Sequence, residues 1–168
     1  DCIEDGIAGA GAAAVAAPNL ALGMALFARI VEQAAAAFRV APGFEPYLVE
    51  WHRRAKADRP SGTARALASR IAEADPSWAP AEQPAGRAAP GTLEVVAVRS
   101  GANPGSHLVG FDGPGESIEL RHVARDRSAY AAGTLAALDW LAAVPRAPGL
   151  HPFAEVVDAL VERGPREV

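Results

Sequence analysis

The chain has 168 residues, of which 50% are hydrophobic and 21% charged, with 16 basic and 20 acidic residues. Its one cysteine, Cys2, excludes a disulfide framework, and without a cluster of Cys and His we expect no metal site. A net charge of −4 gives no reason to expect a nucleic-acid partner, and no apolar run reaches membrane-spanning length, so we expect no membrane contact and a cytoplasmic location.

The first third of the chain predicts a strand, a long helix and a second strand. Residues 1–11 are small, acidic and rich in glycine, and show no periodic pattern. The apolar run 12–17 predicts a short buried strand. From Asn19, apolar side chains recur at helical spacing, and this helix can be capped by Asn19 and ends at Pro42. Alternating polarity over 45–53 predicts the next strand.

The rest of the chain predicts two loops, three further strands and three helices. A loop over 54–60 leads to a helix that begins at Ser61-Gly62-Thr63. Residues 75–91 are rich in Pro, Ala and Gly, which indicates one long exposed loop. The predicted strands are 92–99, 106–112 and 116–124, and the last predicted helices are 126–144 and 152–163. This order predicts an α+β fold, in which a mixed β-sheet is covered on one face by helices.

Lys56 is the only lysine of the chain, so wherever the sequence needs an ordinary positive charge it has arginine. A lysine ammonium can give up a proton where an arginine guanidinium cannot. His52 precedes it by four residues, at the end of a predicted strand, and histidine exchanges protons near neutral pH. The helix that begins at Ser61 presents unpaired N–H groups, which bind a carboxylate or phosphate. These residues predict a small anionic substrate beside a proton donor; the alternative is an ordinary surface lysine.

The run from Glu50 to Ala64 resembles the signature E-x-H-H-x-x-K-x-D-x-P-S-G-T-A of the 4-hydroxy-tetrahydrodipicolinate reductases, also called dihydrodipicolinate reductases. Shorter matches to the family extend the resemblance from about residue 12 to about residue 160. They are Ala17-Pro18-Asn19-Leu20 with Gly23, Arg99-Ser100-Gly101 with Gly105 and His107, the set His122, Ala124, Arg127, Tyr130, Ala131 and Gly133, and Gly149-Leu150.

The resemblance implies an oxidoreductase that converts 4-hydroxy-tetrahydrodipicolinate to tetrahydrodipicolinate in the diaminopimelate route to lysine, with NADPH or NADH as cofactor. It implies that His52 is the catalytic acid or base and that Lys56 donates a proton and contacts the substrate, a cyclic dicarboxylate. It also implies a homotetramer built through the sheet over 92–124. The other site residues that it implies are Arg53, Ser61, Gly62, Thr63 and Arg127 for the substrate, and Ala17, Pro18, Asn19 and Leu20 for the cofactor.

The sequence departs from the family pattern at Arg53, where the family has a second histidine. Arginine can bind a carboxylate through two hydrogen bonds, but it is never neutral. Arg53 therefore leaves open a reductase-like enzyme that acts on another cyclic dicarboxylate. His107 and His122, on predicted strands, are expected to be core or network histidines rather than catalysts.

The second departure is the absence of the amino-terminal dinucleotide-binding domain of the family. The chain begins with Asp1 rather than Met, and we expect a fragment in which 1–17 is the end of that domain and 18–168 the substrate-binding and oligomerisation domain. The run Gly9–Ala14 fits G-x-G-x-x-A only loosely, because no apolar strand precedes it, and we expect no fingerprint there. The missing domain leaves a non-catalytic oligomerisation or ligand-binding module as a second open function.

Overall fold

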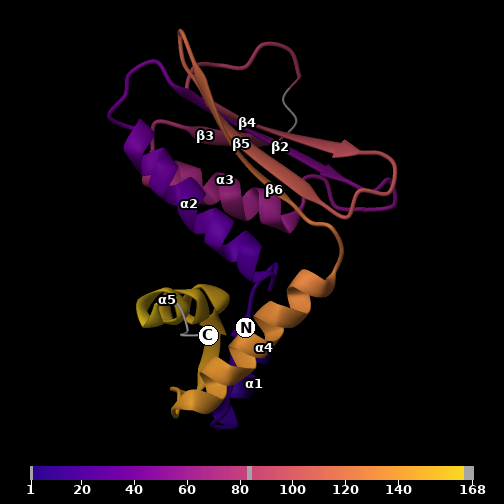
Figure 1. The fold of residues 1–168 in the computed structure, drawn as a ribbon, viewed down its shortest axis with the longest axis vertical. Helices are drawn as coiled ribbons and strands as arrows, with labels where there is room; N and C mark the ends of the chain where they lie inside the picture. Colours follow the sequence, from indigo (N-terminus) through magenta and orange to yellow (C-terminus); the bar gives the residue numbers. More distant parts are fainter. Residues whose placement is uncertain (1, 83–84, 165–168) are drawn as a thin grey trace. The chain divides into compact units, whose positions relative to one another are not determined.

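A computed structural model describes residues 2–82 and 85–164 of the chain (Figure 1). The helices are α1 (Cys2–Gly9), α2 (Leu22–Phe38), α3 (Gly62–Ala74), α4 (Ser128–Ala143) and α5 (Phe153–Arg163). The strands are β1 (Ala13–Ala16), β2 (Glu45–His52), β3 (Ala79–Glu82), β4 (Thr92–Arg99), β5 (Ser106–Asp112), β6 (Ser117–Val123) and β7 (Gly149–Pro152). The chain divides into two compact units: the residues up to Leu26 together with those from Ser128 onward, and Phe27–Arg127.

The unit Phe27–Arg127 is built on a five-stranded sheet with the strand order β3-β4-β2-β5-β6 (Figure 1). β3, β4 and β2 run parallel, whereas β2, β5 and β6 are antiparallel neighbours. The sheet is therefore mixed, which confirms the predicted α+β class. β2 is its central strand, and its side chains alternate between two environments: Leu48, Glu50 and His52 are buried, and Trp51 is exposed.

One face of this sheet is covered by α3, which contacts β2, β3 and β4, as predicted (Figure 1). The side chains packed there are almost wholly buried; among the largest are Leu48, Leu67, Ile71, Leu93, Val95, Val109 and Phe111. Burying each such side chain stabilises the fold by about 1.5–3 kcal/mol. The other face of the sheet carries the exposed apolar side chains of Trp51, Val96, Val98 and Val123, which we call the open face.

The second unit contains a pair of parallel strands, β1 and β7, with α1, α4 and α5. Its buried apolar cluster includes Trp140, Phe153 and Val156. Gly133 of α4 lies so close to the backbone carbonyl of Leu20 that a Cβ atom at this position would overlap it, so only glycine allows this approach. Among the described helices, none is long and apolar enough to cross a membrane.

Three elements were not predicted, and β1, which was predicted to be buried, is half-buried over Ala13–Val15 and exposed at Ala16. α1 forms where no periodic pattern was expected, because its apolar side chains are too few to mark a face. β3 lies inside the stretch predicted as one long loop; it is an edge strand, which is where a sheet tolerates a proline such as Pro80. β7 was not predicted, because its four residues become a strand only by pairing with β1, more than a hundred residues away.

Candidate active site

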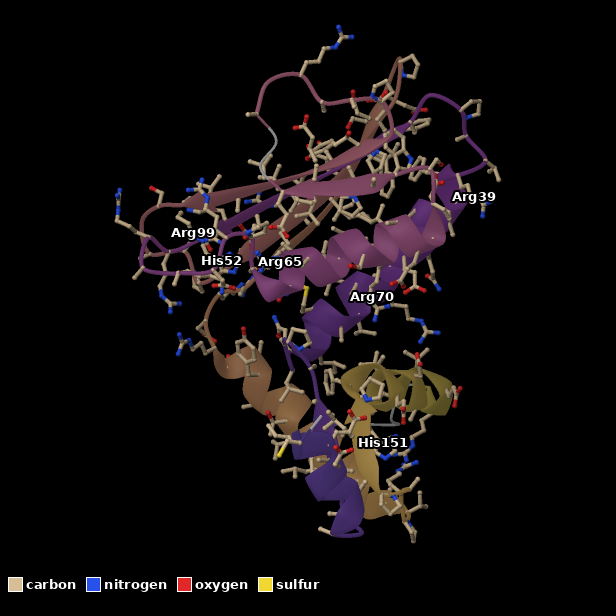
Figure 2. All side chains as sticks on the ribbon, turned by 180° about the vertical axis from the view of Figure 1, so that it is seen from behind. Arg39, His52, Arg65, Arg70, Arg99 and His151 are labelled. Carbon is tan, nitrogen blue, oxygen red and sulfur yellow. The ribbon has the colours of Figure 1, made fainter. Side chains whose placement is uncertain are left out.

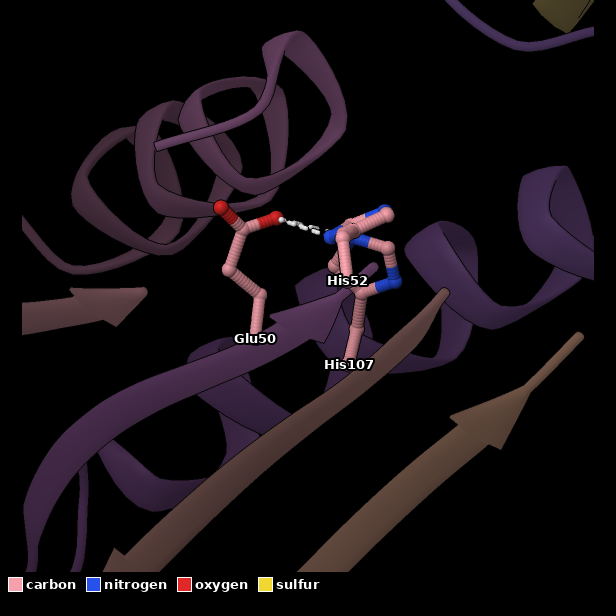
Figure 3. A group of neighbouring side chains, drawn as sticks. All are labelled: Glu50, His52 and His107. Atoms are coloured by element: carbon pink, nitrogen blue, oxygen red, sulfur yellow. Dashed lines mark ion pairs between the residues drawn. The ribbon is translucent and has the colours of Figure 1, made fainter. Parts of the chain in front are cut away.

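A buried carboxylate at the end of β2 lies at the centre of the candidate site. Glu50 and His52 are two residues apart on the strand and therefore share its covered face. Glu50 is fully buried, and its Oε1 accepts hydrogen bonds from the backbone N–H of Ser61 and from Arg99, both at 2.7 Å. Its Oε2 lies 3.1 Å from Nδ1 of His52 and 3.6 Å from Nε2 of His107 (Figure 3).

The partners of Glu50 come from four separate segments, and they keep its carboxyl group ionised. Burial alone would raise the pKa of Glu50. The contacts with His107, His52, Ser61 and Arg99 outweigh this effect and hold the pKa well below its usual range. Arg99 supplies the balancing positive charge, because its guanidinium forms an ion pair with the Glu50 carboxylate. The Arg99 side chain is only 7% exposed, and the residue lies opposite His52 in the register of β2 and β4 (Figure 2).

The N-terminus of α3 is the second part of the site. α3 begins after Ser61, as predicted; Ser61 is its N-cap, and the Ser61 hydroxyl accepts a hydrogen bond from the backbone N–H of Ala64 at 3.1 Å. Because this hydroxyl is used in capping, the groups that can face a ligand are the N–H groups of the first helical turn, at Gly62 and Thr63. Gly62 is exposed and Thr63 half-buried, whereas Ser61 is buried.

Lys56 lies in the loop between β2 and α3. Its ammonium is half-buried and pairs with the Asp58 carboxylate at 2.7 Å, and this hydrogen bond lowers the pKa of Asp58. The loop is tied to the sheet by a hydrogen bond from the backbone N–H of Arg54 to the carbonyl of Gly101. Burial is the main cause that lowers the pKa of His107, and the positive charge of Lys56 adds a smaller effect in the same direction. Arg53 is exposed at the start of the loop.

His52, Lys56 and the N-terminus of α3 thus lie within one unit. Arg127, at the end of the same unit, is exposed. The predicted cofactor residues Ala17, Pro18, Asn19 and Leu20 belong to the other unit, in the link from β1 to α2. Ala17 and Pro18 are exposed there, and Oδ1 of Asn19 accepts a hydrogen bond from the N–H of Ala21 at 2.8 Å, one residue before α2 begins.

Sequence reasoning named Glu50, Arg99 and Gly105 within the motifs that carry the resemblance but did not assign them to the site. Glu50 could have been found as the only acidic residue on the strand face that carries His52. Gly105 has φ +156°, and a Cβ atom there would lie 2.9 Å from Nε2 of His52. His107 is 3% exposed and lies against Glu50, so it is a network histidine, as expected.

Glu50, His52 and His107 also form a group whose potential metal-ligating atoms lie within 4.8 Å of one another. The negative charge of Glu50 is already balanced by Arg99. Oε2 lies 3.1 Å and 3.6 Å from the two histidine nitrogens without an aligned hydrogen bond to either.

His107 and His122 predict that the protein loses stability on acidification. Burial lowers the pKa of His107 and of His122 from the ordinary 6.5. Below this pH the unfolded chain binds protons on both rings before the folded chain does, so the free energy of unfolding falls as the pH falls. One histidine contributes at most about 1.4 kcal/mol per pH unit.

We expect His122→Gln to make this dependence shallower, measured by urea unfolding between about pH 7 and about pH 5.5. His151→Gln is the control: the carbonyl of Ala147 and the Glu155 carboxylate raise the pKa of His151, so removing it changes the slope in the opposite sense. A His122→Gln slope equal to that of the unmodified chain would contradict the prediction.

The glycine-rich run near the amino terminus does not have the order of elements that a dinucleotide cofactor needs. Gly9 ends α1, Gly11 is in a turn with φ +65°, and β1 follows. A dinucleotide fingerprint has the opposite order, a strand before the glycine turn and a helix after it, because the helix N-terminus binds the pyrophosphate. The described turn therefore does not fit that role.

Comparisons with known proteins agree on one family. A family model described as dihydrodipicolinate reductase, C-terminus, matches residues 23–157. The chain is 42% identical over 149 residues to a 4-hydroxy-tetrahydrodipicolinate reductase of Myxococcus xanthus, covering 85% of this chain and 53% of that protein. A protein of the same name from Rhodopirellula baltica is 38% identical over 146 residues, covering 84% and 52%. The chain thus spans about half the length of these relatives.

A solved structure gives the same result for the fold. The dipicolinate-bound dihydrodipicolinate reductase from Paenisporosarcina sp. TG-14 is similar to this chain with a TM-score of 0.64 and 26% sequence identity. The similarity covers 82% of this chain and 52% of that one.

Proposed function

Since the chain belongs to the dihydrodipicolinate reductase family and matches its carboxy-terminal part, we propose that it supplies the substrate-binding and acid-base residues of such a reductase. The reaction is the reduction of 4-hydroxy-tetrahydrodipicolinate to tetrahydrodipicolinate. The observation that carries the proposal is the buried Glu50 carboxylate, which contacts both His52 and the N-terminus of α3.

The binding part of the proposal is an anion site for a substrate carboxylate. The N–H groups of Gly62 and Thr63 begin α3, where the helix dipole favours negative charge. Lys56 adds a positive charge, which at present is paired with Asp58. A dicarboxylate would exchange with Asp58 for the Lys56 ammonium. Arg53 and Arg127, both exposed, are then available for the second carboxylate.

The chemical part of the proposal is a proton supplied beside the bound ring. When bound, a nicotinamide cofactor, NADPH or NADH, supplies the hydride. Lys56 at Nζ or His52 at Nε2 supplies the accompanying proton, a role that both side chains can fill. Ala17, Pro18, Asn19 and Leu20 would contact the nicotinamide end of the cofactor; the exposure of Ala17 and Pro18 supports this. The remainder of the cofactor site would come from a dinucleotide-binding domain, of which 1–17 would be the end.

We also propose that the open face is covered in a homotetramer, which would act in the cytoplasm. Trp51, Val96, Val98 and Val123 are each between 37% and 51% exposed on the same face of the sheet. Trp51, Val96 and Val98 lie on the adjacent strands β2 and β4, and exposed apolar patches of this kind mark contacts between proteins. A second candidate function is reduction of another cyclic dicarboxylate, which Arg53 favours, because a fixed positive charge replaces a histidine that can be neutral.

The test is calorimetric binding of pyridine-2,6-dicarboxylate, a planar cyclic diacid, to the chain. We expect saturable binding that Lys56→Met weakens about tenfold or more, since a charge-assisted hydrogen bond is lost. Arg39→Met is the control, because it removes one positive charge at the opposite end of the sheet from His52 (Figure 2). Equal affinities for the chain and for Lys56→Met, or no binding by either, would contradict the proposal. Other planar diacids tested in parallel separate the two candidate substrates.

A further inference from the structure

We infer that Glu50 is a positioning residue, whose carboxylate sets the tautomer of His52 and holds the N-terminus of α3 in place beside it. The inference rests on the proposed function for the role of His52 in the reaction. It goes beyond that function because Glu50 touches neither substrate nor cofactor in the proposed mechanism and acts only through other residues.

The Glu50 carboxylate determines which nitrogen of the neutral His52 ring carries the proton. Nδ1 lies 3.1 Å from Oε2 of Glu50 in an ion-pair contact (Figure 3). Both atoms are buried, and neither makes an aligned hydrogen bond to any other described group, so the carboxylate is the charged group that Nδ1 faces. An ionised carboxylate can only accept, so the proton belongs on Nδ1. The lone pair is then on Nε2, which becomes the atom that takes up and gives up a proton.

Gly105 leaves space beside Nε2, on the other side of the His52 ring. Nε2 of His52 faces Gly105, where a Cβ atom would lie only 2.9 Å from it. The glycine also has a positive φ of 156°, a conformation that side-chain-bearing residues rarely adopt. Two independent features, the Glu50 carboxylate beside Nδ1 and the absence of a side chain at Gly105 beside Nε2, thus leave Nε2 as the atom that exchanges a proton.

The other oxygen of the Glu50 carboxylate, Oε1, holds the start of α3. Oε1 accepts the N–H of Ser61 at 2.7 Å, and Ser61 is the N-cap of α3. The position of the helix start relative to His52 is therefore fixed through one rigid, fully buried group. Arg99 bonds the same oxygen at 2.7 Å and keeps it charged, and the indole of Trp51 donates to the carbonyl of the next residue, Ser100. The paired ends of β2 and β4 thus hold Arg99 against the Glu50 carboxylate.

The test reads the tautomer of His52 by ¹⁵N NMR of the imidazole nitrogens in the chain, at a pH where the ring is neutral. We expect at least about a tenfold excess of the Nδ1–H form, since a hydrogen bond to a charged acceptor favours it strongly. Free histidine in water prefers the other form. A neutral His52 that carries its proton mainly on Nε2 would overturn the inference without any substitution.

Glu50→Gln provides the second arm, because the amide has almost the same shape. Its oxygen can serve either Ser61 and Arg99 or His52, but not both sides at once. We expect the excess of the Nδ1–H form to disappear. Glu155→Gln is the matched control: Glu155 contacts Nδ1 of His151 at 3.0 Å, and its replacement should change the His151 signals and leave those of His52 unchanged. An unchanged His52 tautomer in a folded Glu50→Gln chain would contradict the inference.

Failure of this inference and failure of the proposed function give different results. If dicarboxylate binding is saturable and depends on Lys56 while the His52 tautomer is independent of Glu50, the function stands and the role of Glu50 falls. If the tautomer depends on Glu50 but no dicarboxylate binds, the positioning geometry is real and its ligand is not the one proposed.

Discussion

Replacing Lys56 with alanine is expected to lower turnover about 100-fold or more, the usual loss when a general acid is removed. The assay is reduction of 4-hydroxy-tetrahydrodipicolinate by an enzyme that joins this chain to a dinucleotide-binding domain. Two features of Lys56 explain the expected loss. Lys56 is the only lysine of the chain, and its half-buried ammonium lies in a loop that a hydrogen bond ties to Gly101. No neighbouring arginine can replace it, since arginine does not give up its proton.

The control for this prediction is Arg39→Ala, which removes one positive charge far from His52 within the same unit (Figure 2). We expect it to change turnover less than about threefold, because exposed charges at a distance are screened by salt. A loss of less than threefold for Lys56→Ala as well would remove Lys56 from the mechanism.

Arg99→Met is expected to destabilise the chain by about 3–5 kcal/mol, the largest stability effect of a single substitution in this site. The guanidinium is 7% exposed and lies 2.7 Å from a fully buried carboxylate. Without it, the Glu50 charge remains in the interior with no cation beside it, and an unpaired buried charge is costly. The measurement is the free energy of unfolding from urea titration near neutral pH.

The matched control is Arg65→Met, which breaks an ion pair of the same 2.7 Å length between Arg65 and Glu82. Both of those side chains are nearly half exposed, so water replaces the lost partner and only a small fraction of the Arg99 effect is expected. The double substitution Arg99→Met with Glu50→Leu should recover much of the lost stability, because an apolar pair removes the buried charge. Equal losses for Arg99→Met and Arg65→Met would show that burial of the pair has no effect.

Much of the unit Phe27–Arg127 could be predicted because its signals are local. The alternation over 45–53 predicted β2, and Ser61-Gly62-Thr63 before an apolar helical face predicted the start of α3; the structure confirms both. The strands over 92–124 were predicted to within one residue at each end, since turns rich in glycine and proline separate them. The motif around Lys56 also predicted the family, which the comparisons confirm.

What could not be predicted depends on residues distant in the sequence. Glu50 and Arg99 are 49 positions apart, and they meet only because β2 and β4 pair in parallel with His52 opposite Arg99. The strand pair of β1 and β7 is likewise a property of the folded chain. The capping role of the Ser61 hydroxyl, which takes it away from the ligand, was also not foreseen. The assignment of Arg127 and of Ala17 to Leu20 to a binding site stays a prediction.

The alternation along β2 connects the proposed contact between subunits to the proposed proton-transfer residues. Glu50 and His52 point to the covered side, while Trp51, between them, is 41% exposed on the open face. A single residue of one strand therefore separates the surface that we propose to be covered in the homotetramer from the residues that we propose to move protons. Separating the subunits would then change the surroundings of Trp51 and, through the strand itself, those of His52.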